Sequence, residues 1–283
     1  MATDSTGFGM PRNLLRSMPR HLPKPATPAP GLPPLICLWP ERLLFVGPLG
    51  KVAPHRHAAT VLLVALQGEV RVWLSAERQW HSAQSALVPA GCMHALDLRE
   101  GITAVFYNDP HRPFHPRMSA RDGGAAQFDP VAGTPLPEAL RAFHASQGAN
   151  AVALEHALAT TLGRYPQAPL LDARVQQAIQ LVQADLTENL PLAALAEAAA
   201  LSPSRLQHLF QDQTGVPLRR FRNWIRFRHA LERIAAGATL TTAAFDAGFA
   251  SSTHFSHAFK AMFGVAPASV LAGSSPPRIL TLA

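Results

Sequence analysis

The sequence is poor in cysteine and in charged residues. Its 283 residues include two cysteines, and only 15% are charged. Two cysteines cannot build a disulfide framework or a zinc site made of cysteines, so we expect a reducing compartment. No apolar run approaches the roughly 18–20 residues that a membrane span requires, and the N-terminus lacks the apolar stretch of a signal peptide. We therefore expect a cytoplasmic protein with no membrane partner.

The charge that is present is unbalanced. Lysine and arginine number 25 against 18 acidic residues, which gives a net charge of +7 and an isoelectric point near 10.4. A hydrophobic share of 48% is enough to build a core and excludes global disorder. The basic balance favours a polyanionic partner, with a mildly basic enzyme as the alternative.

The first half of the chain changes character at about residue 35. Residues 1–34 contain eight prolines and several arginines, which predicts a disordered basic arm or, alternatively, a tail that follows DNA. Residues 35–112 hold short apolar or alternating runs separated by turn residues. Such spacing is typical of an antiparallel β-sandwich or β-barrel.

The second half is helical. Residues 113–169 form a loop and a helical connector, with helices expected over 136–143 and 152–162. Residues 170–273 have helical periodicity throughout. The last residues, 274–283, are expected to be a disordered tail.

A short pattern occurs twice in the helical half, at an offset of 49 residues. Each copy begins with a serine suited to cap a helix and ends at a glycine, which permits the left-handed turn that stops a helix. A short apolar helix and a tight turn precede each copy. This arrangement is typical of a helix-turn-helix, and two copies in one basic chain predict DNA binding. The matched pairs are Ser202 and Ser251, Leu206 and Phe255, His208 and His257, Phe210 and Phe259, Gly215 and Gly264, and Val216 and Val265.

The segment between the two copies is rich in arginine. From 201 to 233 there are seven arginines and two acidic residues, a local charge of +5. A duplex requires cations beside the helices that read it, so we expect phosphate contacts from some of these arginines, including Arg226. The alternative is a solvated helix face whose arginine stems cover apolar residues.

These features resemble the DNA-binding domain of the AraC/XylS family of bacterial transcription regulators. The resemblance covers about residues 172–272 and implies two helix-turn-helix units, joined by a long helix, that read adjacent major-groove segments. It also implies a homodimer, with helices between 136 and 162 as the candidate interface, and RNA polymerase as a candidate partner of an activator. The matching text is Leu195-Ala196, Leu201-Ser202-Pro203, Leu206, Leu209-Phe210, Thr214-Gly215, Arg226-Phe227, Ala230, Gly248-Phe249, His254 to Lys260, Phe263-Gly264-Val265 and Pro267.

The first half resembles a cupin sensor domain of the same family. The similar residues are His55-Arg56-His57, Gly68 and the segment from Pro89 to His94. In cupin enzymes two histidines, a glutamate and a third histidine bind a metal. The glutamate is missing here, because residues 58–63 contain no carboxylate. A divalent metal on His55, His57 and His94, with Cys92 as a fourth ligand, is one alternative, and histidines that line a pocket are the other.

The outer faces of the two predicted reading helices are the candidate DNA-binding surface. Arginine and glutamine can read guanine and adenine edges through paired hydrogen bonds, and the alternative is an ordinary polar surface. The candidate residues are Ser204, Arg205, Gln207, His208 and Gln211 in the first copy and Ser252, Thr253, Ser256 and His257 in the second, together with Arg226.

The sequence as a whole predicts an α+β multidomain protein. We expect an N-terminal cupin-like antiparallel β-barrel and a C-terminal all-α double helix-turn-helix. The expected function is sequence-specific DNA binding that regulates transcription, controlled by a small-molecule effector in the cupin domain, with no catalytic activity. The alternatives are a metal-sensing regulator and a metal-dependent cupin enzyme. The missing glutamate and the 49-residue repeat argue against the enzyme.

Overall fold

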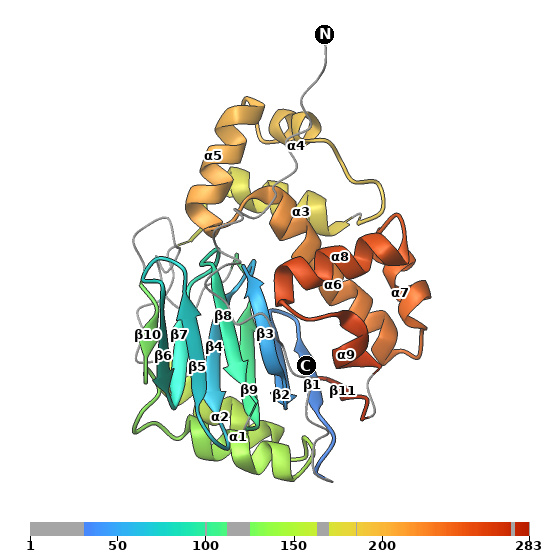
Figure 1. The fold of residues 1–283 in the computed structure, drawn as a ribbon. Helices are drawn as coiled ribbons and strands as arrows, with labels where there is room; N and C mark the ends of the chain where they lie inside the picture. The colour runs from blue at the N-terminus through green and yellow to red at the C-terminus, as the bar shows by residue number, and fades with distance from the viewer. Residues whose placement is uncertain are drawn as a thin grey trace.

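The computed structural model describes residues 31–99, 101–111, 125–162, 170–184, 186–272 and 275–282. They form a β-domain with two covering helices and a C-terminal helical domain that packs against it (Figure 1). The predicted α+β architecture is therefore confirmed. Most of the predicted N-terminal arm lies outside the described residues, as do residues 113–124 and 163–169 of the predicted loop and connector.

The β-domain consists of two sheets. The larger sheet has the strand order β10-β7-β4-β9-β2-β1-β11 and the smaller one has the order β3-β8-β5-β6. All neighbouring strands are antiparallel except β1 and β11. The strands are β1 (Leu35–Trp39), β2 (Arg42–Gly47), β3 (Gly50–His55), β4 (Thr60–Ala65), β5 (Val70–Leu74), β6 (Gln79–Ala83), β7 (Ser85–Val88), β8 (His94–Leu98), β9 (Thr103–Asn108), β10 (Gln127–Phe128) and β11 (Arg278–Thr281).

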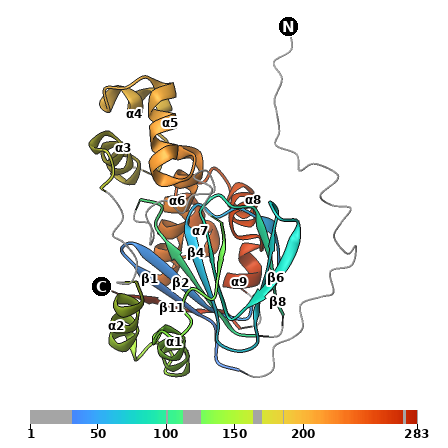
Figure 2. The ribbon, with the colours of Figure 1, turned by 90° about the vertical axis from the view of Figure 1, so that its left-hand side faces the viewer.

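Side-chain alternation along the strands produces two cores. Leu63 and Val105 of the larger sheet and Val72 and Leu96 of the smaller sheet point into the space between the sheets. The opposite face of the larger sheet is covered by α1 (Leu136–Ala145) and α2 (Ala151–Leu162) (Figure 2). Because both of its faces are covered, β4 is buried at every position, which explains its continuous apolar sequence.

Two segments that were expected to lie outside the β-domain contribute strands to it. The tail over 274–283 is not wholly disordered, since β11 pairs in parallel with β1, and Leu280 packs against the core under α1 and α2. Backbone hydrogen bonds from Arg278 to Pro34 and from Leu282 to Leu38 extend this pairing. The apolar side chains of Ile279 and Leu280 and the free edge of β1 together account for the strand. Likewise, β10 comes from the segment that was expected to be a connector.

The C-terminal domain is all helical and has an aromatic core. Phe227 contacts the rings of Phe249, Phe255 and Phe259 at centroid distances of 5.1–5.5 Å. The helices α4 and α5 project beyond the ends of the sheets (Figures 1 and 2). None of the helices within the described ranges is long and apolar enough to cross a membrane. The helices of this domain are α3 (Ala173–Ala184), α4 (Leu192–Ala198), α5 (Pro203–Thr214), α6 (Leu218–Ala235), α7 (Leu240–Asp246), α8 (Ser252–Phe263) and α9 (Pro267–Leu271).

Candidate DNA-binding surface and histidine cluster

The first repeated unit is a helix-turn-helix formed by α4 and α5. The Ser202 side chain accepts a hydrogen bond from the Arg205 amide at 3.3 Å, and Pro203 occupies the first turn of α5. Gly215 ends the helix with a φ of 76°, a left-handed conformation that favours glycine. Leu206 and Phe210 are fully buried, which fixes α5 against its neighbours. The predicted caps and apolar face of this unit are confirmed.

The outer face of α5 holds the predicted DNA-contacting side chains. Ser204, Arg205, Gln207 and His208 are exposed, and Gln211 is partly buried. The helix α5 also extends beyond the ends of the sheets (Figure 1). The structure thus brings these side chains together on one surface, and their contacts with bases remain a prediction.

The second unit repeats the construction with α7 and α8. Ser251 accepts a hydrogen bond from the His254 amide at 3.0 Å, and Gly264 ends α8 with a φ of 73°. Phe255 and Phe259 occupy the buried positions that Leu206 and Phe210 hold in the first unit. Ser252, Thr253 and His257 are exposed and Ser256 is partly buried.

Arg226 does not belong to the candidate DNA-binding surface, which corrects the expectation of a phosphate contact. It is 8% exposed, and its Nε and Nη2 donate hydrogen bonds to the Leu186 carbonyl at 3.1 and 2.9 Å. Its guanidinium also lies 5.9 Å from the centre of the Phe249 ring. The arginine therefore ties α6 to the segment that follows α3.

Most other arginines of α6 are also engaged within the protein. Arg222 contacts Asn189 and the Leu190 carbonyl, Arg228 contacts Asp109, and Arg233 contacts Asp246. Arg219 is exposed near the start of the helix. More of these arginines therefore form contacts within the protein than the sequence pattern indicated.

A buried polar contact that was not predicted joins the two domains. The Asp109 carboxylate, just after β9, accepts hydrogen bonds from Trp224 Nε1 at 2.7 Å and from Arg228 Nη1 at 2.8 Å. Arg228 also donates to the Trp39 carbonyl. Exposures of 7% for the Arg228 side chain and 2% for that of Asp109 show that this ion pair is shielded from water. No local sequence signal connects residues that are more than 110 positions apart in the chain.

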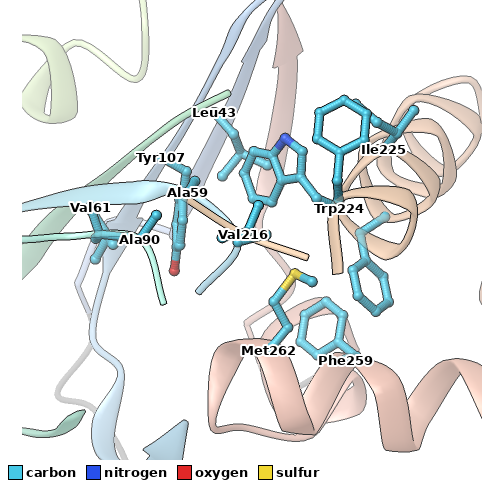
Figure 3. Close-up of a cluster of buried hydrophobic side chains, with 14 of the residues drawn as sticks. Leu43, Ala59, Val61, Ala90, Tyr107, Val216, Trp224, Ile225, Phe259 and Met262 are labelled. Carbon is cyan, nitrogen blue, oxygen red and sulfur yellow. The ribbon is translucent and has the colours of Figure 1, made fainter. Parts of the chain in front are cut away.

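An apolar pocket lies at the same domain interface. Figure 3 shows Leu43 and Tyr107 of the β-domain close to Trp224 of α6, with Phe259 and Met262 of α8 beside them. The polar side chains that line the pocket are His55, His57 and Tyr107 of the β-domain. The lining residues are Ile36, Leu43, Phe45, Leu49, Val52, His55, His57, Leu96, Val105, Tyr107, Leu231, Phe259, Phe263, Val265, Val270 and Leu271.

The three predicted histidines converge beside this pocket. The nitrogen atoms of His55, His57 and His94 that could bind a metal all lie within 4.8 Å of one another, and the three side chains are buried. His55 Nε2 lies 2.9 Å from His57 Nε2. Cys92 is not part of the cluster, and its Sγ instead approaches the Met93 carbonyl. The predicted convergence is confirmed for the histidines alone.

Burial keeps these histidines neutral. Loss of water, reinforced by neighbouring histidines, lowers the pKa of His55 to about 3 and that of His57 well below its usual value. Burial also lowers the pKa of His94 to about 4. At neutral pH all three rings therefore carry a free lone pair, which is the form that binds metal ions.

Comparison with known proteins points to one class of regulator. Residues 195–273 match a family described as a helix-turn-helix domain. The chain is 34% identical over 107 residues to the arabinose operon regulatory protein of Escherichia coli, a match covering 37% of each chain. It is 32% identical over 105 residues to the transcriptional activator RhaS of Escherichia fergusonii, covering 36% of this chain and 37% of that one. The chain thus matches little more than a third of the length of these relatives.

Solved structures share the fold over both domains. ToxT from Vibrio cholerae is 16% identical, with a TM-score of 0.53 and coverage of 81% of this chain and 96% of that chain. ToxT bound to an unsaturated fatty acid is 15% identical, with a TM-score of 0.54 and coverage of 81% and 94%. At this identity the likeness concerns the fold alone. The paired helix-turn-helix units, the matched domain over 195–273 and the identity to these regulators confirm the predicted resemblance of the C-terminal domain to the AraC/XylS family of transcription regulators.

Proposed function

We propose that the protein binds specific DNA sequences through α5 and α8 and thereby regulates transcription. The observation that carries this proposal is the pair of capped helices whose apolar faces are buried and whose polar faces are exposed. The long helix α6 lies between them in the chain and packs against α7, so the two units are held in one body. Two rigidly linked reading helices suit adjacent segments of the major groove.

We further propose that the β-domain receives a small-molecule effector. The apolar pocket supports this, since it is lined from both domains and an occupant would contact both the sheets and α8. A ligand that prefers one arrangement of the domains shifts their equilibrium by its difference in affinity for the two arrangements. A homodimer through α1 and α2, an encounter with RNA polymerase and a cytoplasmic location belong to the same proposal.

Selection of bound sequences from a random duplex library, with the full-length protein, tests the DNA-binding proposal. We expect one enriched motif with two segments. Exposed Arg205, Arg219 and Lys260, together with helix amino ends, provide about three to six phosphate contacts. The logarithm of the binding constant should then fall with the logarithm of salt concentration at a slope between about −3 and −5. No enriched motif and a slope near zero would overturn the proposal.

A further inference from the structure

The histidine cluster is arranged as metal-binding histidines usually are. His55 Nδ1 lies 2.7 Å from the Ala53 carbonyl, and His94 Nδ1 lies 3.0 Å from the Cys92 carbonyl. Each Nδ1 must therefore carry the proton and donate it, which leaves Nε2 with a free lone pair. Backbone carbonyls commonly orient metal-ligating histidines in this way.

The cluster cannot satisfy its own hydrogen-bonding capacity. His57 Nε2–H can donate to His55 Nε2, but His94 Nε2 then has no hydrogen-bond partner among the described residues. Buried nitrogen atoms without partners are costly and uncommon in folded proteins. A metal ion that accepts lone pairs from all three rings would give His94 Nε2 a partner and so remove the cost of leaving it without one.

We propose that His55, His57 and His94 bind a divalent transition metal ion, and that this ion controls how the β-domain holds the two reading helices. Three imidazoles, with no carboxylate in the cluster among the residues that the structure describes, suit Zn²⁺ or Cu²⁺ and do not suit Mg²⁺ or Ca²⁺. The positive charge of Arg220 reaches His57 and opposes any cation, which further favours metals that bind imidazole strongly. The control of the helices rests on the proposed function, whereas metal binding does not.

The link to DNA binding lies in the two segments that carry the ligands. The first, residues 53–57, contacts the end of α8, where the Ala53 amide donates to the Gly264 carbonyl at 3.1 Å. A side-chain carbon built on Gly264 would lie 2.6 Å from His55 Nδ1, so the contact leaves no free space.

The second segment, residues 91–94, lies close to the end of α5. A side-chain carbon built on Gly91 would lie 3.5 Å from the carbonyl oxygen of Gly215. The equivalent glycines of the two repeats, Gly215 and Gly264, therefore each lie beside a segment that would supply a metal ligand. An ion that draws these two segments together acts on the ends of both reading helices at once.

Metal titration of full-length protein, prepared without a histidine tag and freed of metal with a chelator, tests the site directly. We expect one equivalent of Zn²⁺ to bind in competition with a chromophoric chelator, and Co²⁺ to give the absorption bands of a protein-bound ion. His94→Gln should weaken Zn²⁺ binding by about 100-fold or more, the upper range for disturbed metal sites. His156→Gln removes an exposed histidine of α2 and should change nothing.

Circular dichroism and thermal melting establish that the His94→Gln variant is folded, and His55→Gln serves as a second variant if it is not. Folded wild-type protein that binds no Zn²⁺, Cu²⁺ or Co²⁺ would overturn the metal site. Equal affinities of the wild type and folded ligand variants would do the same.

The control of the helices is tested by measuring DNA affinity with Zn²⁺ and with chelator. We expect at least a fivefold change in the dissociation constant, the lower range for coupled sites, and loss of that change in His94→Gln. Reciprocity requires that the selected DNA alter Zn²⁺ affinity by the same factor. Metal binding with unchanged DNA affinity would limit the ion to a structural role and overturn the coupling. Absence of any DNA binding would instead contradict the proposed function. The metal site would then be judged from the metal titration alone.

Discussion

At the scale of single residues, the first reading helix is held by an aromatic contact. Phe210 is fully buried and its ring lies 5.3 Å from that of Phe221 on α6 in a T-shaped arrangement. Phe210→Ala should lower the free energy of unfolding by about 3–5 kcal/mol, through lost burial and the cavity left behind. Urea unfolding of the full chain measures this. Gln207→Ala, on the exposed face of the same helix, is the control and should stay within about 0.5 kcal/mol of the wild type.

Individual residues also show where the sequence predicted the structure correctly and where it did not. The apolar period and the serine caps identified the buried and outer faces of α5, because one side of that helix meets solvent. The same reasoning gave a wrong prediction of a phosphate contact for Arg226. Residues 224–228 of α6 are all buried, so the helix is enclosed on every side there. An arginine in such a helix bonds to backbone carbonyls, and composition alone cannot distinguish this role from phosphate binding.

At the scale of elements, α5 and α8 differ in what they offer to DNA. The outer face of α5 has longer polar side chains than that of α8. Changing both Gln207 and His208 to alanine should weaken binding to the selected sequence at least about tenfold, since a good base contact contributes about 1–3 kcal/mol. Changing both Ser256 and His257 to alanine should weaken it less. Fluorescence anisotropy measures both variants, and circular dichroism checks that they are folded.

A larger loss from the α8 pair would contradict this ranking and make the second unit the main reader. If neither pair mattered, recognition by these helix faces would be excluded.

The strand β11 could not be predicted from the sequence, for a different reason. Its four residues have too short a pattern to indicate a strand, and only the unpaired edge of β1, more than 240 residues earlier, gives them a partner.

At the scale of the whole molecule, a buried carboxylate is one of the contacts that join the two domains. Asp109→Ala would leave Arg228 buried without its partner, which typically costs about 3–5 kcal/mol. We expect a loss of this size in urea unfolding, with the β-domain and helices separating more readily. Asp246→Ala breaks the exposed pair with Arg233 and should cost no more than about 1 kcal/mol. Similar losses in the two variants would show that Asp109 does not secure the interface.

The sequence could predict the two domains and the three histidines, but not the way the domains meet. The histidines belong to a recognisable motif, so their convergence followed from the resemblance. The contacts of Asp109 with Trp224 and of Gly264 with Ala53 join distant positions in the chain. Such contacts depend on the docking of completed domains and leave no periodic signal.

The pairing of β1 with β11 also bears on the order in which the protein can be completed during synthesis. The ribosome delivers β1 long before its outer partner β11, which follows the helical domain in the chain. Until β11 emerges, β1 keeps one row of backbone groups without its outer partner, while the helical domain is made and docks beside it. The β-domain is therefore N-terminal in sequence but is completed only after the entire helical domain has been translated.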